Sequence, residues 1–274
     1  MKQMLKIEIE RAFGGIAFYV ALLIGFAISL VQFLNVGVRA ALNPLHFYEF
    51  NGLLFPENVS YVWMGAVSDV YYNVFIRIIP ILVVMPYAVS YYSDRRHGII
   101  DNYYIRTKKI NYLMAKLTAV FLSGGVITIF PLVINLISTS AILPTLMWPT
   151  ATNEVRSGAM MSSLYYSHVS IYNILYFILL FICGGLLATI PLMVSLWLNN
   201  TFVVLMFPTV LCEFINVAAG WSSSYVIKGV RPERLFNMAQ ITPNNIWSYI
   251  VFIVSIVLLD MVMYVWRGVK HDAL

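Results

Sequence analysis

The sequence predicts an all-α polytopic membrane bundle of six transmembrane helices, preceded by an amphipathic interfacial helix at the N-terminus. Two observations lead to this fold class. Of the 274 residues, 61% are hydrophobic and only 11% are charged, whereas an average soluble domain has about 25% charged residues. The chain also contains six apolar stretches of about 20 residues, which is the length of helix that crosses the hydrocarbon core of a bilayer.

The apolar stretches predict a single transmembrane domain over residues 1–274. The segments between them have no cysteine and no alternating pattern that would indicate an independently folded domain. Gly124-Gly125 and Gly184-Gly185 stand at equivalent places in the third and fourth stretches, and small residues of this kind predict close helix packing. The expected spans cover residues 16–34, 73–92, 117–139, 171–198, 201–219 and 246–266.

The N-terminal segment, residues 1–13, has the spacing of an amphipathic helix. Its apolar side is formed by Met1, Met4, Leu5, Ile9 and Ala12, and its polar side by Lys2, Lys6 and Glu10. Such a helix beside a membrane span is expected to lie in the interface, with its lysines near anionic headgroups. It is either a simple anchor or a lever that a cytoplasmic partner pushes.

The distribution of basic residues predicts the orientation. With the N-terminus inside, eleven of the seventeen Lys and Arg residues fall on the cytoplasmic side, in segments shorter than the outer ones. We therefore expect both termini to be cytoplasmic and the protein to lie in the cell membrane, multi-pass, of a bacterium. The net charge of +5 is explained by this asymmetry, so no nucleic-acid partner is expected.

The sequence contains no recognisable catalytic or metal-binding pattern. Cys183 and Cys212 lie inside apolar runs, and the four histidines are scattered without metal-ligand spacing. The G-x-x-x-x-G-K-[ST] phosphate loop, H-E-x-x-H and G-x-S-x-G are all absent from the sequence. We expect no catalytic residue, no metal site and no cofactor bound by this chain.

The inner loop over residues 93–112 is the strongest candidate for binding a partner protein. Two charge clusters flank an apolar and aromatic middle, so tyrosine and isoleucine can fill a partner's pocket while basic side chains fix the orientation. The alternative is an ordinary basic cytoplasmic segment without a partner. The candidate partner-binding residues are Asp94, Arg95, Arg96, Gly98, Tyr103, Tyr104, Arg106, Lys108 and Lys109.

In this layout the chain resembles the ABC-2 type permease subunits of ATP-binding cassette transporters. Those subunits have six spans, cytoplasmic termini and an amphipathic N-terminal helix, then an acidic residue followed by Gly after the second span, a basic segment, and a Lys that opens the third span. Asp94, Gly98, residues 106–109 and Lys116 fall at those places. The chain departs from the pattern at three places. The family often has Glu where this chain has Asp94, Gly-Thr where it has Gly98-Ile99, and Pro-Ser-Arg where it has Arg106-Thr107-Lys108.

The resemblance implies a membrane-spanning permease subunit of an exporter, without enzymatic activity of its own. A separate ATPase subunit would bind ATP and Mg²⁺ and grip the inner loop, and a second permease subunit would complete a homo- or heterodimer. The many aromatic and Met residues favour an apolar or amphipathic substrate such as a peptide, drug or lipid. The alternatives are an ion-gradient-driven secondary transporter or channel and, third, an intramembrane enzyme.

Three charged residues fall within the expected spans. Arg77 and Glu213 both lie in the outer half of the bilayer, where we expect them to pair across the bundle, with Glu213 either a structural partner or part of the translocation path. Arg77 could instead extend outward to the interface. Asp260 lies near the inner end of the last span and is expected to be structural.

Overall fold

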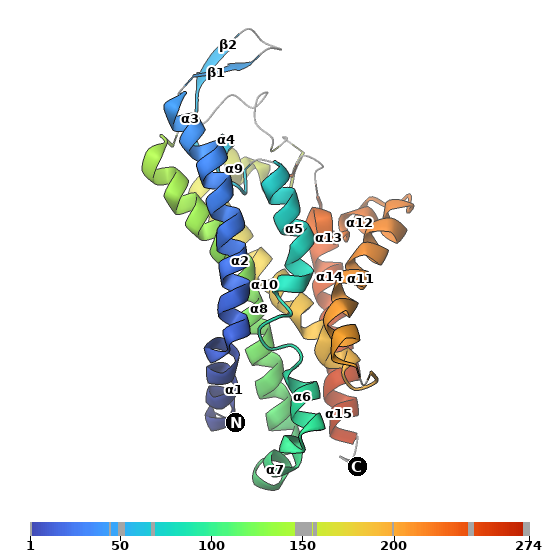
Figure 1. Cartoon of the computed structure of the whole chain (residues 1–274). Helices are drawn as coiled ribbons and strands as arrows, with labels where there is room; N and C mark the ends of the chain where they lie inside the picture. Colours follow the sequence, from blue (N-terminus) through green and yellow to red (C-terminus); the bar gives the residue numbers. More distant parts are fainter. Residues whose placement is uncertain are drawn as a thin grey trace.

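The computed structural model describes residues 2–43, 45–48, 53–66, 69–145, 155, 158–198, 200–240 and 244–270. Within these residues, five helices are long and apolar enough to cross a membrane: Ile16–Leu42, Lys109–Ile142, Val169–Val194, Thr201–Gly220 and Ile246–Val269. They coincide with five of the six expected spans and are compatible with a multi-pass membrane protein. The chain is therefore a helical bundle (Figure 1).

The long helices run roughly alongside one another, and both termini lie at the same end of the bundle (Figure 1). The first consists of α2 (Ile16–Gln32), the π-helical turn η1 (Phe33–Gly37) and α3 (Val38–Leu42). It is followed by α8 (Lys109–Ile142), α10 (Val169–Val194) and α11 (Thr201–Gly220). The last consists of α14 (Ile246–Leu259), the π-helical η2 (Asp260–Trp266) and α15 (Arg267–Lys270).

Short elements complete the bundle. At the end opposite the termini, β1 (Leu45–Tyr48) and β2 (Leu53–Pro56) form an antiparallel hairpin (Figure 1). Near the same end lie α4 (Val59–Val62), α9 (Ser162–Ser167), α12 (Tyr225–Gly229) and α13 (Pro232–Leu235). At the terminal end lie α1 (Lys2–Gly14), α6 (Ser90–Arg96) and α7 (Ile99–Arg106).

The remaining expected span, residues 73–92, which is the second in chain order, is not one continuous helix. Helix α5 (Val70–Leu82) is only 13 residues long, and α6 begins at Ser90 after a stretch of turns. Pro86 lies in that stretch, and its ring nitrogen cannot donate to the carbonyl four residues earlier, which ends a helix. The six-helix count is thus not confirmed, although α5 and α6 together extend along most of the bundle (Figure 1).

The connection between the fourth and fifth expected spans is also longer than the two-residue turn at 199–200. Helix α10 ends at Val194, four residues before the expected end of the span. The side-chain oxygen of Asn200 accepts hydrogen bonds from the backbone N–H groups of Phe202 and Val203, so Asn200 caps the N-terminus of α11. Asn199 lies outside the described residues.

Helices α8 and α10 pack through their glycine pairs, as the sequence predicts. A Cβ atom at Gly185 would lie 2.6 Å from the carbonyl oxygen of Phe121, and one at Gly184 would overlap the side chain of Thr128. On α8, a Cβ at Gly124 would overlap Ala188. The two backbones can approach this closely only because neither glycine pair carries a side chain.

A hydrogen-bonded network inside the bundle joins α2, α8 and the segment after α4. Asn135 donates to the side-chain oxygen of Gln32 at 2.8 Å and accepts from the backbone N–H of Met64 at 2.8 Å. Gln32 donates in turn to the carbonyl of Val62 at 2.9 Å. Both side chains are fully buried, and their pairing removes the cost of burying amides.

Helix α1 forms as predicted but packs on the protein, and a separate interfacial helix is not confirmed. Its buried residues, Met4, Glu8 and Ala12, are spaced by four and form one face. That face lies against α8. The predicted apolar residues Met4 and Ala12 therefore contact the bundle, while Met1 lies outside the described residues.

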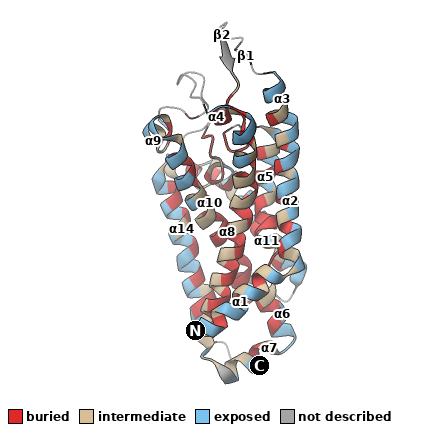
Figure 2. Cartoon of the chain, turned by 90° about the vertical axis from the view of Figure 1, so that its left-hand side faces the viewer, coloured by how far each residue is buried: buried red, intermediate tan, exposed pale blue. Residues whose placement is uncertain are grey.

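The outer faces of the long helices are apolar. Buried residues concentrate where helices meet, and exposed residues face outward along α2 and α14 (Figure 2). Many of the exposed residues are large and hydrophobic, such as Leu23, Val210 and Phe214, each about two-thirds exposed. A water-facing surface would not carry so many, and hydrocarbon is the medium that suits them.

Candidate functional site

Three charged side chains are buried at the end of the bundle that holds both termini. Glu8 comes from α1, Asp94 from α6 and Lys116 from α8, with exposed fractions of 0%, 1% and 0%. Arg11 of α1 joins them with a side chain that is 35% exposed. These four residues form a charge cluster. Charged groups are almost never buried in this way unless they are paired.

Every member of the charge cluster has an oppositely charged partner. Arg11 donates hydrogen bonds to both carboxylate oxygens of Asp94, from Nη2 to Oδ1 at 2.7 Å and from Nη1 to Oδ2 at 3.1 Å. The ammonium of Lys116 lies 2.5 Å from Oδ2 of Asp94 and 3.3 Å from Oε2 of Glu8. Two acids and two bases give zero net charge, which is the condition for burying ions at a tolerable cost.

Hydroxyl groups occupy further acceptor positions of the carboxylates. Tyr87 donates to Oε2 of Glu8 at 2.6 Å, and Tyr112 donates to Oδ2 of Asp94 at 2.8 Å. The rings of the same two tyrosines lie 4.9 and 5.1 Å from the ammonium of Lys116, a geometry that attracts a cation to the ring face. The tyrosines thus both orient the acids and shield the lysine.

The pairing keeps Asp94 and Arg11 ionised. Burial alone raises the pKa of Asp94, but hydrogen bonds from Arg11 and the charge of Lys116 outweigh burial and hold that pKa below its usual value. The hydrogen bond to Asp94 raises the pKa of Arg11 above its usual value. At neutral pH the bridge between α1 and α6 is therefore a full ion pair.

Helical spacing explains how each element presents its members of the charge cluster. Glu8 and Arg11 are three residues apart on α1, and Tyr112 and Lys116 are four apart on α8, so each pair shares one helix face. On α6, Ser90 stands one turn before Asp94 and accepts a hydrogen bond from Lys116 at 3.2 Å. The cluster joins α1, α6 and the start of α8 at a single point.

Helices α6 and α7 form a short hairpin at the terminal end of the bundle (Figure 1). Gly98 joins them with a φ of 66°, a left-handed conformation that glycine adopts at little cost. Ring contacts hold the hairpin to α8: Tyr103 stacks on Tyr112 with centroids 5.3 Å apart, and Tyr104 meets the same ring edge-on at 5.9 Å. The hairpin thus touches the charge cluster through Tyr112 as well as Asp94.

The structure divides the predicted partner-binding residues into an inner and an outer group. Asp94 is buried and contacts Arg11 and Lys116, and its predicted contact with a partner stays a prediction. Tyr103, Tyr104 and Lys109 are half-buried. Four lie on the surface, Arg95, Arg96, Gly98 and Lys108, while the side chain of Arg106 lies outside the described part of the chain.

Sequence reasoning missed half of the charge cluster. Glu8, Arg11 and the two tyrosines were not singled out, because their partners lie far away in the chain: Arg11 and Asp94 are 83 residues apart, and Glu8 is still further from Lys116. One local signal exists: Glu8 stands between Met4 and Ala12 on the apolar face of the N-terminal helix. An acid on an apolar face requires a partner, which could have directed attention to a buried base.

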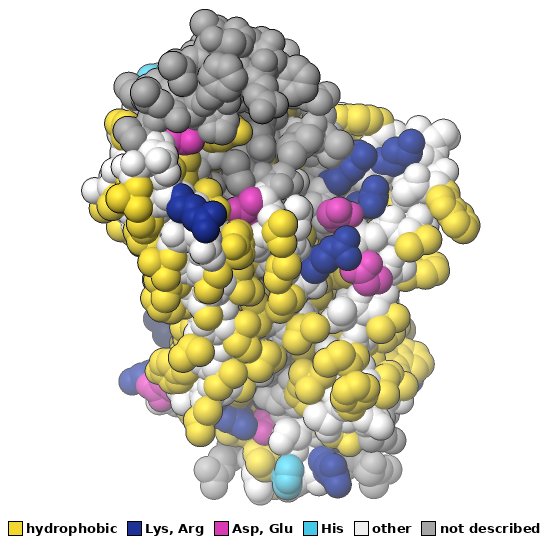
Figure 3. Space-filling model, turned by 45° about the horizontal axis from the view of Figure 1, so that its top comes forward, with side chains coloured by type: hydrophobic (Ala, Val, Ile, Leu, Met, Phe, Trp, Pro, Cys, Tyr) yellow, Lys and Arg dark blue, Asp and Glu magenta, His cyan; other side chains and the backbone are white. Residues whose placement is uncertain are grey.

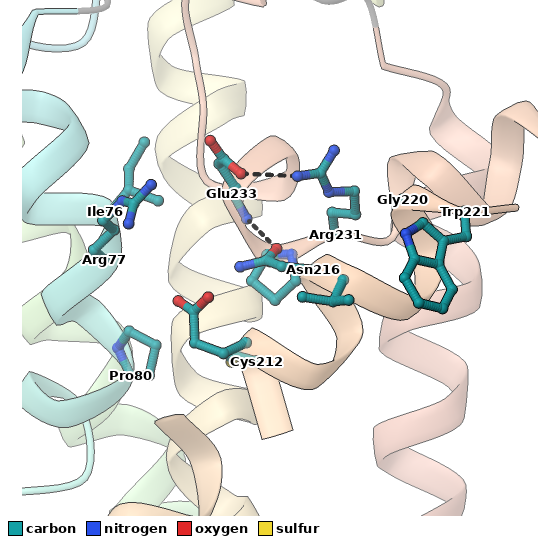
Figure 4. Close-up of a pocket in the computed structure, with 12 residues that line it drawn as sticks. Ile76, Arg77, Pro80, Cys212, Asn216, Gly220, Trp221, Arg231 and Glu233 are labelled. Carbon is teal, nitrogen blue, oxygen red and sulfur yellow. Dashed lines mark hydrogen bonds and ion pairs between the residues drawn. The ribbon is translucent and has the colours of Figure 1, made fainter. Parts of the chain in front are cut away.

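Arg77 and Glu213 share a cavity but do not form the predicted ion pair. The cavity has a volume of about 420 Å³ and lies between α5, α11 and the start of α13 (Figure 4). Both side chains are exposed, and the ion pair formed within its lining joins Arg231 to Glu233 at 3.1 Å. The sequence thus predicted that the two residues share a region of the bundle, whereas the ion pair that it predicted between them is not formed.

Comparison of the chain with protein-family models, with curated proteins and with solved structures gives no match.

Proposed function

We propose that this chain is the membrane-spanning permease subunit of an ATP-binding cassette exporter of the ABC-2 type. The observation that carries the proposal is the charge cluster, because it ties the N-terminal helix and the predicted partner-binding loop to the longest helix of the bundle. A loop that only connected two spans would need no such link, whereas a loop that transmits force to the bundle needs a firm attachment to it.

In this proposal a separate ATPase subunit binds the exposed side of the α6–α7 hairpin. Arg95, Arg96 and Lys108 offer positive charge there, and Ile105, which is 84% exposed, offers an apolar anchor. ATP binding and hydrolysis in that subunit displace the hairpin. The charge cluster passes the displacement to α1 and α8, and α8 passes it to α10 across the glycine contact.

The basic residues support an orientation with both termini in the cytoplasm. The elements at the terminal end of the bundle carry many basic residues, namely Lys2, Lys6, Arg11 and those of the hairpin (Figure 1). This concentration favours the terminal end as the cytoplasmic one. We place the protein in the cell membrane of a bacterium, paired with a second permease subunit, and exporting an apolar or amphipathic substrate such as a peptide, drug or lipid.

Purification from native membranes tests the proposal. The tagged chain, extracted in mild detergent, is expected to bring with it a second polypeptide that hydrolyses ATP. Replacing Arg95 and Arg96 together with Glu is expected to reduce its recovery at least tenfold, whereas Lys6→Glu, an exposed change on α1, is expected to leave it unaltered. Recovery of the chain without any ATP-hydrolysing polypeptide would contradict the proposal.

An ion-gradient-driven transporter is the second candidate, and two features favour it. The segment from α5 to α6 is a discontinuous helix, a form common at ion sites of such carriers. Asp260 is a buried carboxylate that accepts a hydrogen bond from Thr189 at 2.7 Å, while its other oxygen has no partner in the described residues. Transport that stops on Asp260→Asn and needs no ATP would favour this candidate.

A further inference from the structure

The cavity between α5 and α11 contains charges that no other described residue of the chain pairs. Its polar lining consists of Arg77, Glu213, Asn216, Trp221, Arg231 and Glu233. Among the described residues, neither Arg77 nor Glu213 has an ion-pair partner within 4 Å. Arg231 binds Glu233 through Nη2, but its Nε is buried and has no hydrogen-bond partner in the part of the chain that the structure describes. Figure 4 shows the guanidinium of Arg231 beside Glu233 in this cavity.

The position of these charges makes their lack of partners costly. Helix α11 is long and apolar enough to cross a membrane, and Glu213 lies within it. Charged groups at membrane depth face protein, water or a bound ligand and not hydrocarbon. Acidic and basic side chains gather on this face of the molecule, in the half opposite the termini (Figure 3). The lining therefore suits a ligand that is itself charged.

The signs of the charges restrict the class of ligand. Two arginines and two glutamates line the cavity, so the lining has no net charge. An anionic amphiphile would meet both glutamates, and a cationic one would meet both arginines. A zwitterion satisfies both sets, with its anion near the arginines and its cation near Glu213. The volume of about 420 Å³ falls within the range of small-molecule sites.

An apolar groove adjoins the cavity. It has a volume of about 680 Å³ and runs between α10, α11 and α14, and two residues, Cys212 and Pro232, line both hollows. Its walls include Phe207, Leu211, Phe252 and Ile256. A hydrocarbon chain attached to a group in the cavity could bury its apolar surface against these side chains. The exposed ring of Trp221 at the cavity is a side chain typical of membrane interfaces.

We propose that the cavity binds the headgroup of a zwitterionic phospholipid from the bilayer leaflet at the end opposite the termini, with an acyl chain in the adjoining groove. Arg77 and Arg231 bind the phosphate, and Glu213 binds the ammonium. As the substrate class of the exporter, this inference rests on the proposed function. As a binding site, it is tested without ATP or a partner subunit.

Binding to the purified chain in nanodiscs tests the site. The probes are phosphatidylethanolamine and phosphatidylglycerol, each with the same fluorescent acyl chain, so that only the headgroup differs. The parent is expected to bind the zwitterionic lipid about tenfold more tightly than the anionic one. Glu213→Gln is expected to bring this ratio close to one, because it removes the partner of the ammonium. Arg77→Gln is expected to weaken the binding of both lipids, because both carry the phosphate.

The ratio of the two affinities makes the test independent of folding, since both lipids are measured on the same preparation. Arg39→Ala, an exposed arginine of α3 away from the cavity, is the matched control and is expected to keep the tenfold preference. Equal binding of both lipids by the parent, or an unchanged ratio in Glu213→Gln, would overturn the proposal. Either result would leave the assignment as a permease subunit untouched, because that depends on recovery of the ATPase subunit.

Discussion

Lys116 contacts two buried carboxylates through one ammonium group. Replacing it with Met removes the charge but keeps the volume, so Glu8 and Asp94 remain buried with two negative charges and only Arg11 to balance them. Breaking a buried ion pair from one side costs about 3–5 kcal/mol. Lys116→Met is therefore expected to lower the free energy of unfolding by about that amount in a thermal or denaturant assay in detergent.

An exposed lysine provides the control for this substitution. Lys6 on α1 lies 3.8 Å from Glu10 with both side chains largely exposed, so Lys6→Met is expected to change stability by less than about 0.5 kcal/mol. Equal effects of the two substitutions would show that the charge cluster does not hold α1 to the bundle.

The lowered pKa of Asp94 predicts how stability depends on pH. Since the pKa is lower in the folded protein than the value of about 3.9 for unfolded chains, the stabilisation from Asp94 is complete above pH 4. It is lost as the pH falls through the folded pKa. The difference in melting temperature between the parent and Asp94→Asn is expected to be constant from pH 8 to 5 and to shrink below about pH 4. A difference that grew on acidification would contradict this.

At the residue scale, the sequence predicted positions better than contacts. Asp94, Gly98 and the basic residues around them lie where the sequence placed them, at one end of the bundle. The identity of Asp94's partners depends on how three distant segments meet, which no local pattern specifies. The same holds for Arg77 and Glu213, whose shared half of the bundle was predictable and whose separation was not.

At the scale of elements, the contact between α8 and α10 gives a sharp prediction. Gly184→Ala places a methyl group against the side chain of Thr128, while Gly220→Ala in α11 meets nothing within 4 Å. Overpacking of this kind costs about 1–3 kcal/mol. We expect Gly184→Ala to lower the melting temperature clearly and Gly220→Ala to leave it unchanged or slightly raised, and the opposite order would rule out the close contact.

Element boundaries show which sequence signals were sufficient. Long apolar runs predicted five of the helices because bilayer thickness sets their length. Whether a proline bends a helix or ends it depends on whether the freed backbone groups find other partners. Helix α8 continues through Pro131, whereas residues 83–89 around Pro86 form turns. That outcome is decided by tertiary packing.

For the whole molecule, composition predicted the class of protein, and the distribution of basic residues suggested its orientation in the membrane. A hydrophobic fraction of 61% is sufficient to predict a membrane bundle. A chain with so many hydrophobic residues exposes a surface that water solvates poorly. The docking of α1 onto α8 was not predictable, because an amphipathic helix can bury its apolar face in lipid or in protein. Glu8 at the centre of that face decides in favour of protein, where Lys116 and Tyr87 are its partners.

In the proposed function, the charge cluster makes α1 and the α6–α7 hairpin move as one body when the ATPase subunit hydrolyses ATP. Distances between spin labels in the complex with the proposed ATPase subunit test it directly, with labels at Lys6→Cys on α1, His97→Cys in the turn between α6 and α7, and Thr201→Cys on α11. These three positions are exposed, and the native Cys183 and Cys212 are buried.

Adding ATP is expected to change the distance from position 6 to position 201 while the distance from 6 to 97 stays constant and narrowly distributed. Lys116→Met is expected to broaden the distance from 6 to 97. A parent complex in which ATP changes the distance from 6 to 97 as much as the distance from 6 to 201, or changes neither, would contradict the claim.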